Sequence, residues 1–153
     1  MGVIEGTKIS IGENKTKNIE EIKENDKVIS CDIDTLPKKS HPDIAMSWTT
    51  KSPVIIKTGS SVIKIWKELT DIYLIINDNL SISCDHVVFY KNEEEICSWN
   101  NAKSLRIGDY LFSDTLEFIK IEKIEKKKEK KIIYNLSISH NPNYFANGIL
   151  IHN

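Results

Sequence analysis

The stretch of sequence that decides the fold is the end of the chain, Asn143 to Asn153, which reads NYFANGILIHN. Two largely apolar runs, 143–146 and 149–152, flank Asn147-Gly148, a residue pair that favours a tight hairpin turn. The pattern predicts two short paired strands at the carboxyl end of the chain.

The last two residues, His152 and Asn153, form a candidate cleavage site. The side-chain nitrogen of an asparagine can attack its own main-chain carbonyl, which closes a succinimide ring and breaks the next peptide bond. An adjacent histidine can polarise that carbonyl or give a proton to the departing amine. A His-Asn ending also arises by chance, so its meaning depends on the rest of the chain.

Outward from this hairpin, short β-branched or alternating runs recur between turn signals, which predicts an all-β fold. We expect two long strands over 116–124 and 132–139, and the Lys-rich segment 126–131 that joins them is typical of a solvated turn. Further hairpins and single strands are expected, at 54–66 with a turn over Thr58-Gly59-Ser60-Ser61, at 72–83, at 87–99, at 7–10 and at 27–31.

Helix is scarce in the predicted structure. Only 19–24 and 101–105 have the pattern of a short helical turn. The segment 34–52 contains Pro37, Pro42 and many small polar residues, so we expect it to be a long surface loop.

One internal repeat is visible. Residues Ile19 to Ser30 resemble Ala102 to Ser113, since each segment has two apolar residues three apart, a turn residue followed by Asp, and a strand that ends in Ser. Each copy predicts a helical turn, a bend with Asp as hydrogen-bond acceptor, and a strand. Two copies favour a duplicated β unit with pseudo-two-fold symmetry, although this local arrangement is also common in unrelated proteins.

Bulk properties narrow the class of protein. A length of 153 residues predicts one domain over residues 1–153. A formal net charge of -1 lacks the basic excess of a nucleic-acid binder. No apolar run approaches the roughly 20 residues of a membrane-spanning helix. Three widely spaced cysteines without a CxxC pair, Cys31, Cys84 and Cys97, argue against a disulfide framework or a zinc site. We expect a cytoplasmic monomer without a signal peptide.

A second candidate site is Ser83-Cys84-Asp85-His86, at the end of an expected strand. The imidazole of His86 can hydrogen-bond a nearby peptide and protonate its nitrogen as a nucleophile expels it. Ser83 can hold the carbonyl of the same peptide, and Asp85 shares the face of Ser83 in an extended segment. The alternative is an ordinary strand-end turn in which Ser83 and Asp85 bind backbone groups.

Taken together and in order, these segments resemble the intein or Hint (hedgehog-intein) superfamily, and the resemblance spans essentially the whole chain. The matching segments are Gly6-Thr7-Lys8-Ile9, Asp26-Lys27-Val28, Ser83-Cys84-Asp85-His86, Tyr134-Asn135-Leu136 and Asn143 to Asn153. The resemblance implies a horseshoe-like β fold and autocatalytic protein splicing. It implies no cofactor and no metal, because each acyl step exchanges one linkage for another. The implied partners are flanking host-protein segments in cis.

The resemblance also implies a role for each site residue. His86 would destabilise the first scissile amide and protonate its nitrogen, and Ser83 would orient that bond. His152 would assist the cyclisation of Asn153. Asn135 stands where relatives often carry Asp or Cys, and an amide can hydrogen-bond but cannot take a proton. From the residues alone, Asn135 either faces outward or points into a site.

Three departures from the family pattern bear on activity. The family's nucleophile falls on Gly2, which has no nucleophilic side chain, so the chain resembles a trapped or excised form that cannot complete splicing. No acceptor residue follows Asn153. Pro142 stands where the family often has a histidine, and His140 reaches the site only if its loop bends.

Fewer than 50 residues separate His86 from Tyr134, too few for a homing-endonuclease domain. A mini-intein or bacterial intein-like domain is therefore expected. Two alternatives remain: a Hint domain that cleaves without ligation, either intein-like or toxin-releasing, and a non-catalytic β-barrel binding module.

Overall fold

The computed structural model describes residues 1–34, 36 and 41–153. Its strands form two antiparallel sheets, which confirms the all-β prediction. In the first sheet the strands lie in the order β13 (Ile124–Lys127), β7 (Tyr73–Ile76), β8 (Leu80–Ile82), β1 (Val3–Ile4), β14 (Lys131–Ile138), β6 (Ile55–Thr70) and β4 (Lys27–Ile33).

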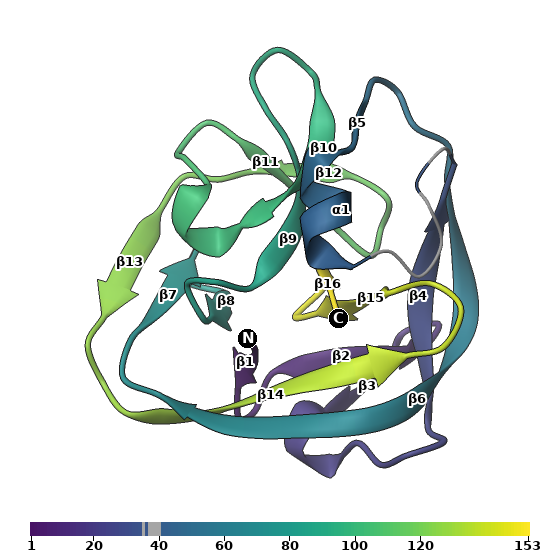
Figure 1. Ribbon diagram of the computed structural model, residues 1–153, viewed down its shortest axis with the longest axis vertical. Coiled ribbons are helices and arrows are strands. Elements are labelled where there is room, and N and C mark those ends of the chain that lie inside the picture. Colours follow the sequence, from purple (N-terminus) through teal and green to yellow (C-terminus); the bar gives the residue numbers. More distant parts are fainter. Residues whose placement is uncertain (35, 37–40) are drawn as a thin grey trace.

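The second sheet completes the architecture. Its order is β12 (Phe118–Lys120), β11 (Tyr110–Phe112), β9 (Val87–Lys91), β16 (Ile149–His152), β15 (Asn143–Ala146), β2 (Lys8–Gly12) and β3 (Lys15–Asn18). Two more strands join it through β9, namely β10 (Cys97–Asn101) and β5 (Thr49–Thr50). Figure 1 shows β6 curving along the base and one side of the molecule, with both chain ends near the middle of the view.

The hairpins expected around 72–83, 87–99 and 143–152 are confirmed, as β7–β8, β9–β10 and β15–β16. The hairpin expected at 54–66 is wrong, because β6 runs without a turn through Thr58-Gly59-Ser60-Ser61. Residues 55–61 of β6 pair with β4, and residues 62–70 pair with β14. Two successive hydrogen-bonded partners hold this segment extended and outweigh its turn-like composition.

The single strand expected over 116–124 is also wrong. It divides into β12 and β13, which lie in different sheets. Ile121 is fully buried between them, and its N–H donates to the Asp109 carbonyl at 2.7 Å. The Lys-rich segment joins β13 to β14, but these strands do not pair, since β13 pairs with β7 and β14 with β6 and β1. Residues 126–130 are exposed, but the solvated turn expected over 126–131 is shorter, because Lys126 and Lys127 belong to β13 and Lys131 begins β14.

The expected loop over 34–52 contains a short helix, α1 (Pro42–Ser47), and the strand β5. Residues 35 and 37–40 of that loop lie outside the described residues. The helix forms because Pro42 occupies its first turn and the His41 side chain caps it by accepting from the Asp43 N–H. Ala45 then buries against the cluster that holds Phe89 and Trp99.

The predicted duplication is confirmed at the level of individual hydrogen bonds. The expected helical turns are η1 (Ile19–Glu21) and η2 (Ala102–Ser104). After η1, the Asp26 carboxylate accepts from the Lys23 N–H at 2.8 Å, and after η2 the Asp109 carboxylate accepts from the Arg106 N–H at 3.0 Å. The repeated sequence pattern therefore builds one repeated structural unit.

The bends before the two aspartates match as well. Asn25 has φ of 72° and Gly108 has φ of 99°, the left-handed conformation that asparagine and glycine tolerate best. The Asn25 N–H donates to the Val62 carbonyl at 2.8 Å, and the Gly108 N–H donates to the Ile121 carbonyl at 2.9 Å. In each unit, the residue before the aspartate thus donates its N–H to a backbone carbonyl further along the chain.

Other expectations concern cysteines, metals and membranes. All three cysteines are free, and Cys31 and Cys97 are buried in the core. Within the described ranges, no group of three or more His, Cys, Asp or Glu side chains is placed to hold a metal ion. None of the helices in that part of the chain is long and apolar enough to cross a membrane.

Candidate functional site

The segment 83–86 lies between the two ends of the chain. It joins β8 to β9, and these strands hold opposite termini: Val3 of β1 pairs with Ile82 of β8, and Ile151 of β16 pairs with Val88 of β9. The fold therefore brings Gly2, the segment 83–86 and Asn153 to one region.

Ser83 holds the amino-terminal position through two hydrogen bonds. The Gly2 N–H donates to Ser83 Oγ at 2.9 Å, and the Ser83 N–H donates to the Gly2 carbonyl at 2.9 Å. Ser83 is buried, so both bonds are shielded from water. Ser83 Oγ thus holds the nitrogen of the amide between Met1 and Gly2, and the Ser83 N–H holds the carbonyl of the following peptide. Among the described residues, the hydrogen bond of His86 goes to the His152 carbonyl instead of to that nitrogen.

Gly2 sits in a space that excludes a side chain. A Cβ atom at this position would lie 2.7 Å from the Tyr134 carbonyl oxygen and 3.0 Å from the Ile133 Cβ. The first of these atoms belongs to the backbone of β14, so a side chain would require β1 or β14 to move. The backbone around position 2 fits glycine.

At the carboxyl end of the chain, His152 and Asn153 are held by three contacts. His152 Nδ1 lies 3.0 Å from the terminal oxygen of Asn153, which stands for the carbonyl oxygen of the scissile bond in a longer chain. Because that oxygen can only accept, Nδ1 is the donor. The Asn153 N–H donates to the Pro142 carbonyl at 2.9 Å, and Trp99 meets the His152 ring edge-on, with centroids 5.3 Å apart.

His86 connects the two halves of the site. Its Nε2 lies 2.7 Å from the His152 carbonyl oxygen, so Nε2 carries the proton and Nδ1 keeps a lone pair. His86 Nδ1 has no hydrogen-bond partner among residues 1–34, 36 and 41–153. Burial lowers the pKa of His86 to about 4, although the bond to His152 acts in the opposite direction. The imidazole is therefore neutral near pH 7, with its proton on Nε2 and a lone pair on Nδ1.

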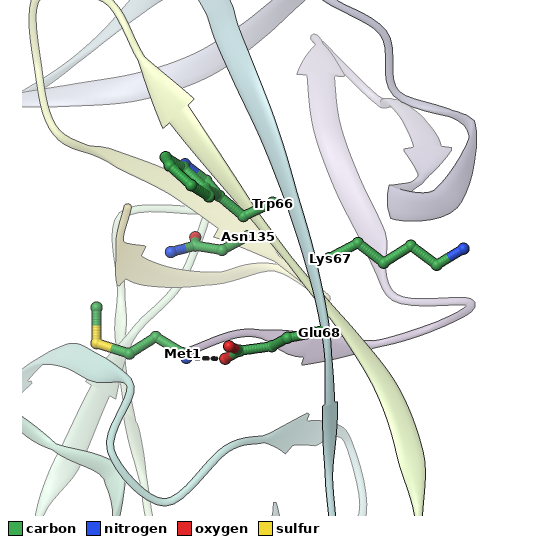
Figure 2. A pocket seen from close by; sticks show the side chains of 5 residues that line it. All are labelled: Met1, Trp66, Lys67, Glu68 and Asn135. Atoms are coloured by element: carbon green, nitrogen blue, oxygen red, sulfur yellow. Dashed lines mark hydrogen bonds and ion pairs between the residues drawn. The ribbon is translucent and has the colours of Figure 1, made fainter.

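Asn135 points into the site rather than outward. Its side-chain oxygen accepts from the Tyr144 hydroxyl at 2.8 Å and from the Leu136 N–H at 2.9 Å. These two donors fix which end of the amide faces the cavity beside Met1, where Figure 2 shows the Asn135 nitrogen. Full burial raises the pKa of Tyr144 well above its usual value, so its hydroxyl stays protonated and keeps donating.

Asp85 lies at the edge of the site. Its side chain is 63% exposed, and its carboxylate is 3.8 Å from the Met1 amino group. Glu68 is closer, with its carboxylate 2.5 Å from the same nitrogen. Glu68 was not among the predicted site residues, because its place beside Met1 arises from the pairing of β6 with β14 and of β14 with β1.

His140 lines the downstream end of the site. It is exposed, has φ of 68°, and borders an open cavity of about 620 Å³ together with His152 and Asn153. His41, at the start of α1, lines the same cavity and was not predicted. The bend at His140 thus places this residue on the rim of the cavity that His152 and Asn153 also line.

The fold that carries this arrangement is the Hint fold of inteins. The bacterial intein-like domain of Clostridium thermocellum superposes with a TM-score of 0.74 and 20% identity, over 99% of this chain and 98% of that one. The gp41-1 intein gives 0.68 and 19%, with 99% and 98% covered. A DnaB intein from Synechocystis gives 0.64 and 15%, also with 99% and 98% covered.

Sequence comparisons are less informative. No family model matches the chain. A reverse gyrase from Methanocaldococcus jannaschii is 30% identical over 54 residues, which is 35% of this chain and 3% of that protein. The chain therefore corresponds to a small part of that relative.

Proposed function

We propose that this chain is a self-processing domain of the protein-splicing type, which acts in cis on flanking host-protein segments. Its carboxyl-terminal reaction is the cyclisation of Asn153, and the observation that carries this proposal is the 3.0 Å contact of His152 Nδ1 with the Asn153 oxygen. A donor at that position stabilises the negative charge that forms on the oxygen when the asparagine side chain attacks.

In this reaction the Asn153 side-chain nitrogen bonds to the Asn153 carbonyl carbon, and the peptide bond to the downstream segment breaks. The side-chain nitrogen gives up one proton, and the departing amine takes up one. His86 supports the step indirectly, because its Nε2–H holds the His152 carbonyl and thereby the main chain that enters Asn153. His140, on the rim of the cavity, is placed to pass a proton to the departing amine.

At the amino-terminal end, Gly2 supplies no thiol or hydroxyl for an acyl shift. Full splicing would need a Cys or Ser there and a nucleophile after Asn153. The tight contact between position 2 and Tyr134 favours the second candidate, a Hint domain that cleaves downstream without ligation. A non-catalytic β-barrel binding module accounts for the strands but assigns no role to the contacts of His86 and His152.

The test is a chain extended beyond Asn153 by a short segment. We expect release of that segment over hours to days, as followed by mass spectrometry, and no release from an Asn153→Ala variant. His152→Ala should slow release by about 100-fold, the usual contribution of a positioned acid–base or donor group. His41→Ala, on the rim of the same cavity, should stay close to the parent rate. Equal release from the parent and Asn153→Ala would rule out the proposal.

A further inference from the structure

The cavity beside Met1 combines groups that match an incoming peptide. It measures about 230 Å³ and is lined by Met1, Trp66, Lys67, Glu68 and Asn135. In Figure 2, Glu68 and Asn135 reach the region of Met1 from neighbouring strands, and Lys67 points away from it. The ammonium group of Lys67 lies instead near the Tyr134 ring, 5.7 Å from its centroid.

Asn135 presents an unused donor to this cavity. The residue is only 8% exposed, and both of its hydrogen bonds are made by the side-chain oxygen. Across the described residues, its Nδ2 has no hydrogen-bond partner. Asn135 Nδ2 is not among the fully buried atoms that lack a partner, so it faces the open cavity, where it can donate to an acceptor that enters from outside.

Glu68 presents the complementary acceptor. Its carboxylate contacts the Met1 ammonium at 2.5 Å, and Asp85 lies 3.8 Å from the same nitrogen. When the chain continues upstream, that ammonium becomes a peptide N–H. The N–H and C=O of a trans peptide point in opposite directions, so an acceptor and a donor that approach it from different strands can bind the same peptide unit.

We infer that Glu68 and Asn135 form a binding site for the upstream flanking segment, in which Glu68 accepts from the Met1 N–H and Asn135 Nδ2 donates to the carbonyl of the residue directly before Met1. With the ammonium charge gone, Glu68 and Asp85 leave this site negative. The site therefore prefers a basic residue directly before Met1 over an acidic one. Tyr144 is a positioning residue, because its hydroxyl keeps the Asn135 nitrogen turned toward the cavity.

This inference rests on the proposed function, since it presupposes flanking segments. It can be tested at equilibrium, because Gly2 has no nucleophile and an upstream extension stays attached. Three chains are compared, each with a short flexible extension that ends in lysine, glutamine or glutamate directly before Met1. The lysine form should have a folding equilibrium constant about two- to five-fold above that of the glutamate form in urea titrations, as expected for exposed charge pairs.

Two variants locate the effect. Glu68→Gln should remove most of the difference between the lysine and glutamate forms. Glu94→Gln, in the turn between β9 and β10, should preserve it. In ¹⁵N-resolved spectra of the parent, the Asn135 side-chain amide protons should shift downfield when the extension is added, and Tyr144→Phe should reduce that shift.

Equal folding constants for the three extended chains, with unchanged Asn135 resonances, would overturn the inference. The same chains also carry a segment after Asn153, so that downstream release is measured in parallel. Release without any upstream charge preference leaves the proposed function intact and removes only this binding site. A charge preference without release supports the binding site and counts against cyclisation of Asn153.

Discussion

At the scale of single residues, the central feature is a neutral, fully buried His86 bonded to the His152 main chain. A protonated imidazole is stabilised by hydration, and burial has removed that hydration. The charged form of His86 is therefore disfavoured. The tautomer of His86 follows from its partner. The His152 carbonyl oxygen can only accept a hydrogen bond, so the His86 Nε2 that contacts it must carry the hydrogen. The protonation of His86 is therefore coupled to the stability of the fold.

That coupling predicts a pH dependence of stability. The pKa of His86 is about 4 in the folded chain and near 6.5 when unfolded, so the unfolded state binds the extra proton more readily. Above about pH 6.5 His86 is neutral in both states and costs no stability. As the pH falls from 6.5 toward 4, the free energy of unfolding decreases, and the loss reaches about 3 kcal/mol. Urea unfolding at pH 7, 6, 5 and 4 should show this slope in the parent and a shallower one in His86→Gln. Parallel curves would contradict the assignment.

A second prediction at this scale concerns Gly2. Gly2→Ala should lower the free energy of unfolding by about 1–3 kcal/mol, because its Cβ meets the Tyr134 carbonyl oxygen at 2.7 Å. Gly12→Ala is the matched control, since a Cβ there has only ordinary contacts with Lys15 at 3.8 Å. Chemical denaturation measures both. A Gly2→Ala variant as stable as the parent would show that position 2 accepts a side chain, and would favour splicing over cleavage alone.

At the scale of elements, β4 and β15 are joined by a side chain instead of a strand ladder. The Asn143 amide accepts from the Cys31 N–H at 2.7 Å and donates to the Cys31 carbonyl at 3.0 Å. Asn143 is fully buried, so it completes the backbone hydrogen bonds of β4 where no strand lies alongside. This pair of bonds joins the first sheet to β15, the first strand of the hairpin that ends at His152.

Asn143→Ala should therefore cost about 2–4 kcal/mol, because it leaves a buried N–H and a buried C=O without partners. Asn92→Ala removes two comparable bonds, to Glu94 and Ile96, but in an exposed turn, and should cost about 1 kcal/mol or less. Urea titrations of the two variants give the comparison. Equal costs would mean that the Asn143 bonds do not carry the contact between the sheets.

The elements also show what sequence could and could not predict. Hairpins with short Asn- or Gly-containing turns were predictable, because their signal is local. The continuous β6 was not, since its turn-like residues 58–61 are held straight by β4 and β14, which are distant in sequence. The same reason applies to the site: Ser83, His86, His152 and Asn153 were visible as motifs, whereas Glu68 and Tyr144 enter only through strand pairing.

At the scale of the whole molecule, the two copies of the repeated unit share their backbone hydrogen bonds but differ in the side chains that they place at matching positions. The Ile19 N–H donates to the Thr7 carbonyl at 2.9 Å, and the Ala102 N–H donates to the His86 carbonyl at 2.8 Å. His86 thus occupies in the second unit the backbone position that Thr7 occupies in the first. The symmetric scaffold was predictable from the sequence repeat. That both chain ends lie beside the second unit could not be predicted without the order of the strands in the sheets.

Cyclisation of Asn153 would leave the released domain with a distinctive chemical end. A chain extended beyond Asn153 should release a domain that ends in a succinimide, one water lighter than a domain ending in a free asparagine acid. High-resolution mass spectrometry of the first product formed, before the ring hydrolyses, measures this directly. We expect the lighter species early and its conversion to the heavier one later. A released domain that carries a free carboxylic acid from the earliest time point would contradict it.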